Sequence, residues 1–84
     1  MKKYTISNEA LTVSVNSFGA EMTSIRSNDD KIEYLWNGDG AYWKRQSPVL
    51  FPIVGSLKNK RYTYKGVDYP MGQHGFARDC DFEV

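Results

Sequence analysis

The sequence has a single cysteine, a single histidine and no long hydrophobic run. Cys80 has no second cysteine with which to form a disulfide, and no cysteine and histidine spacing resembles a zinc site. No apolar stretch approaches the roughly 18 residues of a membrane span, and no apolar signal segment follows the Met1-Lys2-Lys3 start. We therefore expect a cytoplasmic protein with no metal and no membrane contact, and we interpret Cys80 as a small buried hydrophobic residue.

An excess of charge of either sign is missing too. The 11 basic and 10 acidic residues leave a formal net charge of +1. This balance argues against nucleic acid or an anionic membrane as a partner. One histidine cannot serve as acid and base at once, and no pair of carboxylates stands out. A complete acid/base apparatus is therefore missing from this chain.

Aromatic residues, in contrast, are abundant. They make up 14% of a chain of only 84 residues, which is one domain at most or a piece of one. A chain of this length buries only a modest fraction of its surface. The aromatic content therefore predicts strands that pack against a partner surface, which can lie outside the chain.

Apolar and polar residues alternate over much of the first half. Leu11, Val13 and Val15 are spaced by two, and the same spacing recurs over residues 4–6 and 32–36. Period two with β-branched and aromatic residues predicts half-buried strands. A further strand near residues 19–26 breaks the alternation, because its apolar residues are three apart. This spacing predicts a bulge at Gly19 or a change of register.

The second half is less regular. Asp39 is expected to cap one helical turn over residues 41–45. The run "VLFPIVG" contains Pro52 and reads as an edge, a bulge or an extended segment. Residues 61–71 read as a hairpin with a turn at Lys65-Gly66.

After a loop, "DCDFEV" begins another strand that reaches Val84 without a turn. The predicted fold class is all-β, an antiparallel β-sandwich. Strands cut at this point would leave unpaired edges. We therefore expect residues 1–84 to be the amino-terminal segment of a single larger β-sandwich domain.

The stretch "YPMGQHGFARD" holds the candidate binding residues. Gln73, His74 and Arg78 lie within six residues, on a loop that glycines make adaptable. Hydrogen-bonding groups of this kind suit a neutral polyhydroxyl ligand, and aromatic side chains such as Phe76 and Tyr69 offer an apolar platform for a sugar ring. Taken alone, this segment slightly favours the plainer interpretation, in which the side chains of Gln73 and His74 only form hydrogen bonds with backbone groups of the loop.

A second cluster, "AYWKRQSPVLFPIVGSLKNKRY", brings basic and aromatic residues around the apolar run. Taken singly, Trp43 reads as a core residue, and Lys44 and Arg45 read as solvated. A phosphate site here has weak support, because no glycine-rich loop leads into a helix.

The blocks "FGAEMTSIRS", "EYLWNGDGAYWKRQSPVLFPIVGSLKNKRYTYKG" and "YPMGQHGFARDCDFEV" together resemble the amino-terminal part of the aldose 1-epimerase (galactose mutarotase-like) family. The closest likeness is to its LacX-like bacterial branch. The resemblance implies the galactose mutarotase-like supersandwich and an isomerase that interconverts the α and β anomers of a free aldohexose, such as galactose or glucose. It implies no cofactor. It also places the catalytic glutamate base and histidine acid beyond Val84, so this chain alone is expected to be inactive.

Within this chain, the resemblance matches His74 to a family histidine that hydrogen-bonds the sugar. Arg78 and Gln73, the other polar groups of the same loop, are predicted as further substrate-binding residues. Ser56 stands where the family has an arginine. Two other functions stay open. One is a non-catalytic carbohydrate-binding or sensing protein of the same fold. The other is a hexose-6-phosphate epimerase, in which Lys44, Arg45 and Arg78 would hold the phosphate.

Overall fold

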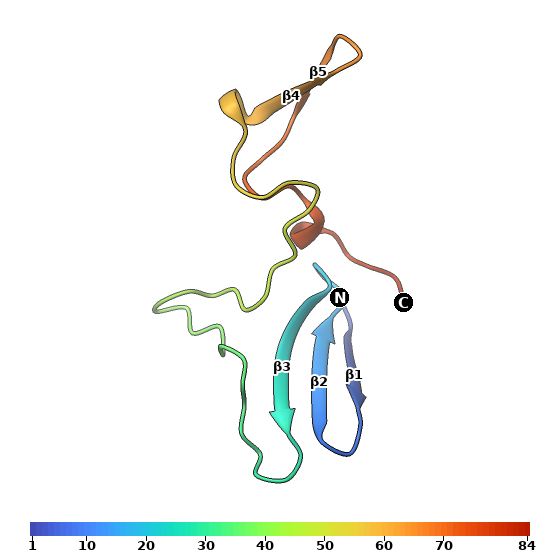
Figure 1. Cartoon of the computed structure of the whole chain (residues 1–84), viewed down its shortest axis with the longest axis vertical. Coiled ribbons are helices and arrows are strands. Elements are labelled where there is room, and N and C mark those ends of the chain that lie inside the picture. Colours follow the sequence, from blue (N-terminus) through green and yellow to red (C-terminus); the bar gives the residue numbers. More distant parts are fainter.

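A computed structural model describes all 84 residues and consists of strands, turns and two single 3-10 turns (Figure 1). The first sheet has the order β1-β2-β3 and comprises β1 (Lys3–Ser7), β2 (Leu11–Asn16) and β3 (Glu21–Ser27). A separate hairpin comprises β4 (Arg61–Tyr64) and β5 (Val67–Pro70), and the 3-10 turns are η1 (Lys58–Lys60) and η2 (Ala77–Asp79). Every pair of strands is antiparallel. The all-β, antiparallel prediction is confirmed. No helix in the chain is long and apolar enough to cross a membrane.

The predicted irregularity near residues 19–26 exists, but it lies inside β3. Ser14 of β2 pairs with Ser24, and Val15 pairs with Met22, so Thr23 is the extra residue. The bulge is therefore at Thr23, and the expectation of a bulge at Gly19 was wrong. The extra residue explains the spacing of three, because it returns Met22 to the face that Ile25 occupies.

The three-stranded sheet has one apolar and one polar face. Ile6, Val13 and Ile25 lie opposite one another across the three strands, and the alternation of side chains puts them on one face. The other face carries Thr5 and Ser14, which also pair across β1 and β2. Nothing in the chain covers the apolar face fully, since Ile6 is 68% exposed.

The chain is elongated, with the sheet and the β4–β5 hairpin at opposite ends (Figure 1). Its radius of gyration is 16.4 Å, whereas a compact chain of this length would have one of about 12 Å. Among the larger apolar residues only Met71 is buried. The site described below lies between the two ends, where the chain from β3 to β4 meets the loop before η2.

The expected strand over residues 32–36 does not form. Arg26 and Glu33 make only an isolated bridge. The Ile25 amide donates to the Glu33 carboxylate at 2.7 Å, not to a backbone carbonyl. A side-chain carboxylate thus takes the place of one backbone hydrogen bond between strands. The alternation of apolar and polar residues gives no sign of such a replacement.

Two smaller expectations need correction, and a third is confirmed except for its end. Residues 80–84 form no strand, because pairing is limited to an isolated bridge between Phe18 and Asp81. The Asp39 side chain does cap one turn, since it accepts a hydrogen bond from the Ala41 amide at 2.9 Å and the Asp39 backbone carbonyl accepts one from the Trp43 amide at 2.9 Å, but the turn ends before Arg45. Cys80 is exposed instead of buried.

Glu33 makes the stability of this part of the chain dependent on pH. The Ser24 hydroxyl and then the Ile25 amide hold the pKa of Glu33 below its ordinary value. A lowered folded-state pKa means that the stabilisation is complete above the unfolded-state pKa and is lost as the pH falls through the lower, folded value. In an NMR titration of the purified protein we expect the Ile25 amide shift to follow this acidic transition. Glu33→Gln should abolish the transition. An Ile25 shift that stays flat in the parent protein would contradict the assignment.

Candidate functional site

An open pocket of about 480 Å³ lies between the segment 43–50 and the loop 73–78. Its volume falls within the range of small-molecule sites, about 300–1,000 Å³. The lining residues are Trp43, Arg45, Gln46, Ser47, Pro48, Leu50, Gln73, His74 and Arg78. All three predicted binding residues therefore line one pocket. The structure also brings residues of the second cluster, Trp43 and Arg45, against them.

Gly75 determines how the loop approaches the apolar run. Its φ is +74°, a conformation that favours glycine. The Phe51 carbonyl accepts hydrogen bonds from the Phe76 amide at 3.0 Å and the Ala77 amide at 3.1 Å. A Cβ on Gly75 would lie 2.3 Å from that carbonyl oxygen. The loop can therefore reach the pocket only because residue 75 has no side chain.

His74 is fastened to Gly55 by two hydrogen bonds. The backbone amide of His74 donates to the Gly55 carbonyl at 2.8 Å, and the Gly55 amide donates to His74 Nδ1, also at 2.8 Å. The ring thus does accept a hydrogen bond from a backbone amide, as the plainer interpretation predicted. Because Nδ1 accepts, the hydrogen of a neutral ring is on Nε2, which has no partner within the chain. His74 can therefore donate one hydrogen bond to a ligand.

Arg78 supplies the unpaired charge of the pocket. Its Nη2 donates to the Gln73 carbonyl at 3.1 Å, and its buried Nε has no partner. No carboxylate lies within ion-pair distance of the guanidinium, because both ion pairs of the chain belong to Arg45. The side chain of Gln73 is exposed at the pocket rim.

Arg45, in contrast, is neutralised by two carboxylates. Nη1 lies 3.3 Å from Glu21 Oε1, and Nη2 lies 2.8 Å from Asp79 Oδ1. Lys44 is exposed and does not line the pocket. Of the three residues considered for a phosphate, only Arg78 therefore offers an uncompensated positive charge at this pocket.

Other candidates lie outside the pocket. Ser56 and Arg61, from the segment where the family arginine was expected, do not line it. Of the aromatic residues, Trp43 contributes to the wall, but Phe76 does not. Tyr69 instead stacks on Tyr62 across the β4–β5 hairpin, with ring centroids 5.2 Å apart.

Sequence reasoning missed the residues that support the pocket wall. Glu21 is buried at the first position of β3, and its carboxylate accepts from the backbone amide of Gln46 at 2.9 Å. The only available signal was an acidic residue next to the apolar Met22 in the expected strand near residues 19–26. No group of three or more histidine, cysteine, aspartate or glutamate side chains that could hold a metal ion is present.

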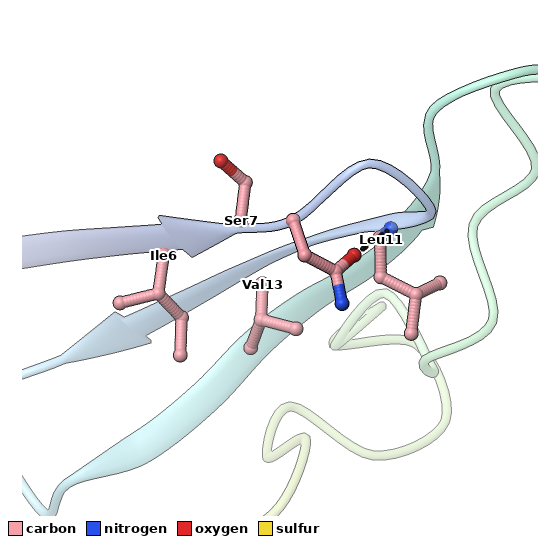
Figure 2. A pocket seen from close by; sticks show the side chains of 5 residues that line it. Ile6, Ser7, Leu11 and Val13 are labelled. Atoms are coloured by element: carbon pink, nitrogen blue, oxygen red, sulfur yellow. Dashed lines mark hydrogen bonds between the residues drawn. The ribbon is translucent and has the colours of Figure 1, made fainter.

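A second depression, at the β1–β2 turn, has a different character. Figure 2 shows Ile6 and Val13 pointing to the same side of the hairpin, with Leu11 near the turn. This groove, of about 230 Å³, is lined by Ile6, Ser7, Asn8, Leu11 and Val13. The Asn8 side chain already accepts from the Leu11 amide at 2.8 Å. The groove has no charged group and is a poor match for a polyhydroxyl ligand.

Comparison with known families agrees with the resemblance seen in the sequence. The sequence profile of the family described as aldose 1-epimerase matches residues 2–84. "Protein LacX, chromosomal" from Lactococcus lactis subsp. lactis is 43% identical over an alignment that covers 94% of this chain and 28% of that protein. The chain thus spans only 28% of the length of this curated relative.

Solved structures show the same fold. A galactose mutarotase related enzyme from Lactobacillus acidophilus superimposes with a TM-score of 0.93 at 51% identity, covering 99% of this chain and 28% of that one. A galactose mutarotase-like protein from Lactobacillus casei gives a TM-score of 0.93 at 41% identity, with the same two coverages, 99% and 28%. The chain therefore has the backbone of a part of these larger proteins.

Proposed function

The chain belongs to the aldose 1-epimerase family, and we propose that the full-length protein which contains it interconverts the α and β anomers of a free hexose. The observation that carries the proposal is the pocket in which His74, Arg78 and Gln73 meet the Trp43 wall. The descriptions of the solved relatives as galactose mutarotase related or galactose mutarotase-like make galactose the first sugar to test.

In the proposed reaction a base removes the proton of the anomeric hydroxyl while an acid protonates the ring oxygen. The C1–O5 bond breaks, the open-chain aldehyde turns, and ring closure from its other face returns both protons. The two roles require groups with separated pKa values. We propose that both groups, a glutamate and a histidine, lie beyond Val84. Within this chain, His74 Nε2 and the Arg78 guanidinium would hold sugar oxygens in place.

We further propose that residues 1–84 are the amino-terminal segment of one larger cytoplasmic β-sandwich domain. Two observations support this. The relatives are longer, and apolar side chains such as Ile6 and Phe51 are exposed to 68% and 60%. Soluble monomers rarely expose extended apolar patches, so these side chains are suited to pack against further strands of the same domain.

A hexose-6-phosphate remains the second candidate substrate. Arg78 favours it as an unpaired cation at the pocket. The ion pairs of Arg45 with Glu21 and Asp79 weigh against it, because a phosphate would have to compete with two carboxylates.

Polarimetry on freshly dissolved α-galactose tests the proposal. We expect the full-length protein to accelerate mutarotation and the isolated 84-residue chain to leave the buffer rate unchanged, because one histidine cannot make both proton transfers. A full-length protein that binds galactose without accelerating mutarotation would instead be a sugar-binding protein. A rate from the isolated chain that His74→Ala abolishes would refute the placement of the catalytic groups beyond Val84.

A further inference from the structure

Glu21 contacts three consecutive residues of the pocket wall. Its carboxylate accepts from Arg45 Nη1 at 3.3 Å, from the Gln46 amide at 2.9 Å and from the Ser47 amide at 3.4 Å. The side chain is buried, with only 11% of its surface exposed. Arg45, Gln46 and Ser47 all line the pocket, whereas Glu21 does not. Glu21 therefore contacts these wall residues without lining the pocket itself.

The start of β3 holds the same segment through its backbone. The Ser47 hydroxyl donates to the Met22 carbonyl at 2.8 Å, and Gln46 Nε2 donates to the Thr23 carbonyl at 2.8 Å. Thr23 is the bulge residue of β3. A bulge leaves a residue unpaired in the ladder, so its carbonyl is available to the segment. The irregularity of β3 thus coincides with the attachment of the pocket wall.

Arg45 extends this attachment across the pocket. It joins Glu21 at the start of β3 to Asp79 in η2, and Asp79 follows Arg78 directly. Asp79 is exposed, with 59% of its side-chain surface accessible, and an ion pair at an exposed carboxylate contributes little. The buried carboxylate of Glu21 is therefore the partner that determines where the Arg45 guanidinium lies.

From these contacts we infer that Glu21 is a positioning residue, which holds Arg45, Gln46 and Ser47 as the wall facing His74 and Arg78. The inference rests on the proposed function for the identity of the ligand. In Glu21→Gln an amide can still accept from one backbone amide. Its NH₂ group, however, would face the donors of Arg45, so the guanidinium and the segment behind it would shift.

Steady-state mutarotase kinetics on the full-length protein test this inference, with Glu33→Gln as the matched control. Glu33 also accepts hydrogen bonds from β3, from Ser24 and Ile25, but it lies outside the pocket. A misplaced binding group can cost on the order of 100-fold in rate. We expect a loss of that size in kcat/KM for Glu21→Gln and nearly unchanged kinetics for Glu33→Gln.

A double variant separates positioning from general structure. If Glu21 acts through Arg45, Glu21→Gln combined with Arg45→Met should lose no more activity than Arg45→Met alone, because coupled residues are not additive. Additive losses would overturn the inference, as would wild-type kcat/KM in Glu21→Gln. Equal losses of activity in the Gln variants of Glu21 and Glu33 would overturn it too.

Failure of the proposed function is seen separately, as a wild-type protein that neither accelerates mutarotation nor binds galactose. In that case a crystal structure of Glu21→Gln decides the matter. A displaced 45–47 segment supports the positioning role, and an unchanged segment overturns it.

Discussion

His74→Ala in the full-length protein should lower kcat/KM for mutarotation on the order of 100-fold, the size of effect that misplacement of a substrate can produce. Alanine removes Nε2, the donor that has no partner within the chain, and also Nδ1, which holds the Gly55 amide at 2.8 Å. The substitution thus removes the proposed contact to the sugar and one of the two hydrogen bonds that fasten the loop. Coupled kinetic assays with galactose measure the effect.

His74→Asn is the matched variant. The φ of His74 is +61°, a conformation in which asparagine is enriched. An asparagine side chain carries an oxygen that can replace Nδ1 as the acceptor for Gly55, but it does not extend to the position of Nε2. We expect a smaller loss than in His74→Ala. If His74→Ala keeps the wild-type kcat/KM, and a sugar-bound structure shows no contact to His74, the ring has only the loop-fastening role.

Gly75→Ala should be the most destabilising single substitution in the loop. A Cβ at this position would lie 2.3 Å from the Phe51 oxygen and 2.7 Å from the Pro52 nitrogen, both of which are backbone atoms. A left-handed alanine costs roughly 1–2 kcal/mol, and the two hydrogen bonds to Phe51 contribute about 1 kcal/mol each. We therefore expect the free energy of unfolding to fall by about 3–4 kcal/mol and sugar binding to be lost.

Gly66→Ala provides the control for Gly75→Ala. Gly66 has a φ of +77°, and no atom lies within 4 Å of the position that a Cβ would occupy. Alanine at this position therefore has the strain of a left-handed backbone but does not collide with another atom. Denaturant unfolding of both variants isolates the effect of the collision. Equal losses of stability would show that the loop can move away from Phe51 at little cost.

Local patterns account for the parts of the fold that were predicted correctly. The β4–β5 hairpin follows from alternating residues around Lys65-Gly66, both of which have positive φ in the structure. The first sheet follows from period two, which places apolar side chains on one face of each strand. The stretch "QHGFAR" contains the three predicted pocket residues, and together with the earlier blocks it indicated the family.

The errors share a different cause. Residues 32–36 alternate as well as β2 does, yet the Glu33 side chain takes the Ile25 amide that a strand would have used. Residues 80–84 hydrogen-bond to Ser17 and Gly19, yet their only strand-like pairing is the isolated bridge between Asp81 and Phe18. Periodicity reports which face of a segment is apolar, but it does not report whether a neighbouring backbone is free to pair.

The sequence by itself therefore determined the antiparallel strands of the sheet and the hairpin, the glycine-containing turns and the loop that brings Gln73, His74 and Arg78 to the pocket, because each depends on residues within a few positions of one another. Only the tertiary structure decided which groups of the pocket are already engaged. The Gly55 amide takes Nδ1 of His74 and leaves Nε2, and Glu21 pairs with Arg45 from 24 residues away. Hydrogen bonds between distant polar groups have no periodicity along the chain, and they form only where the folded backbone brings the partners together.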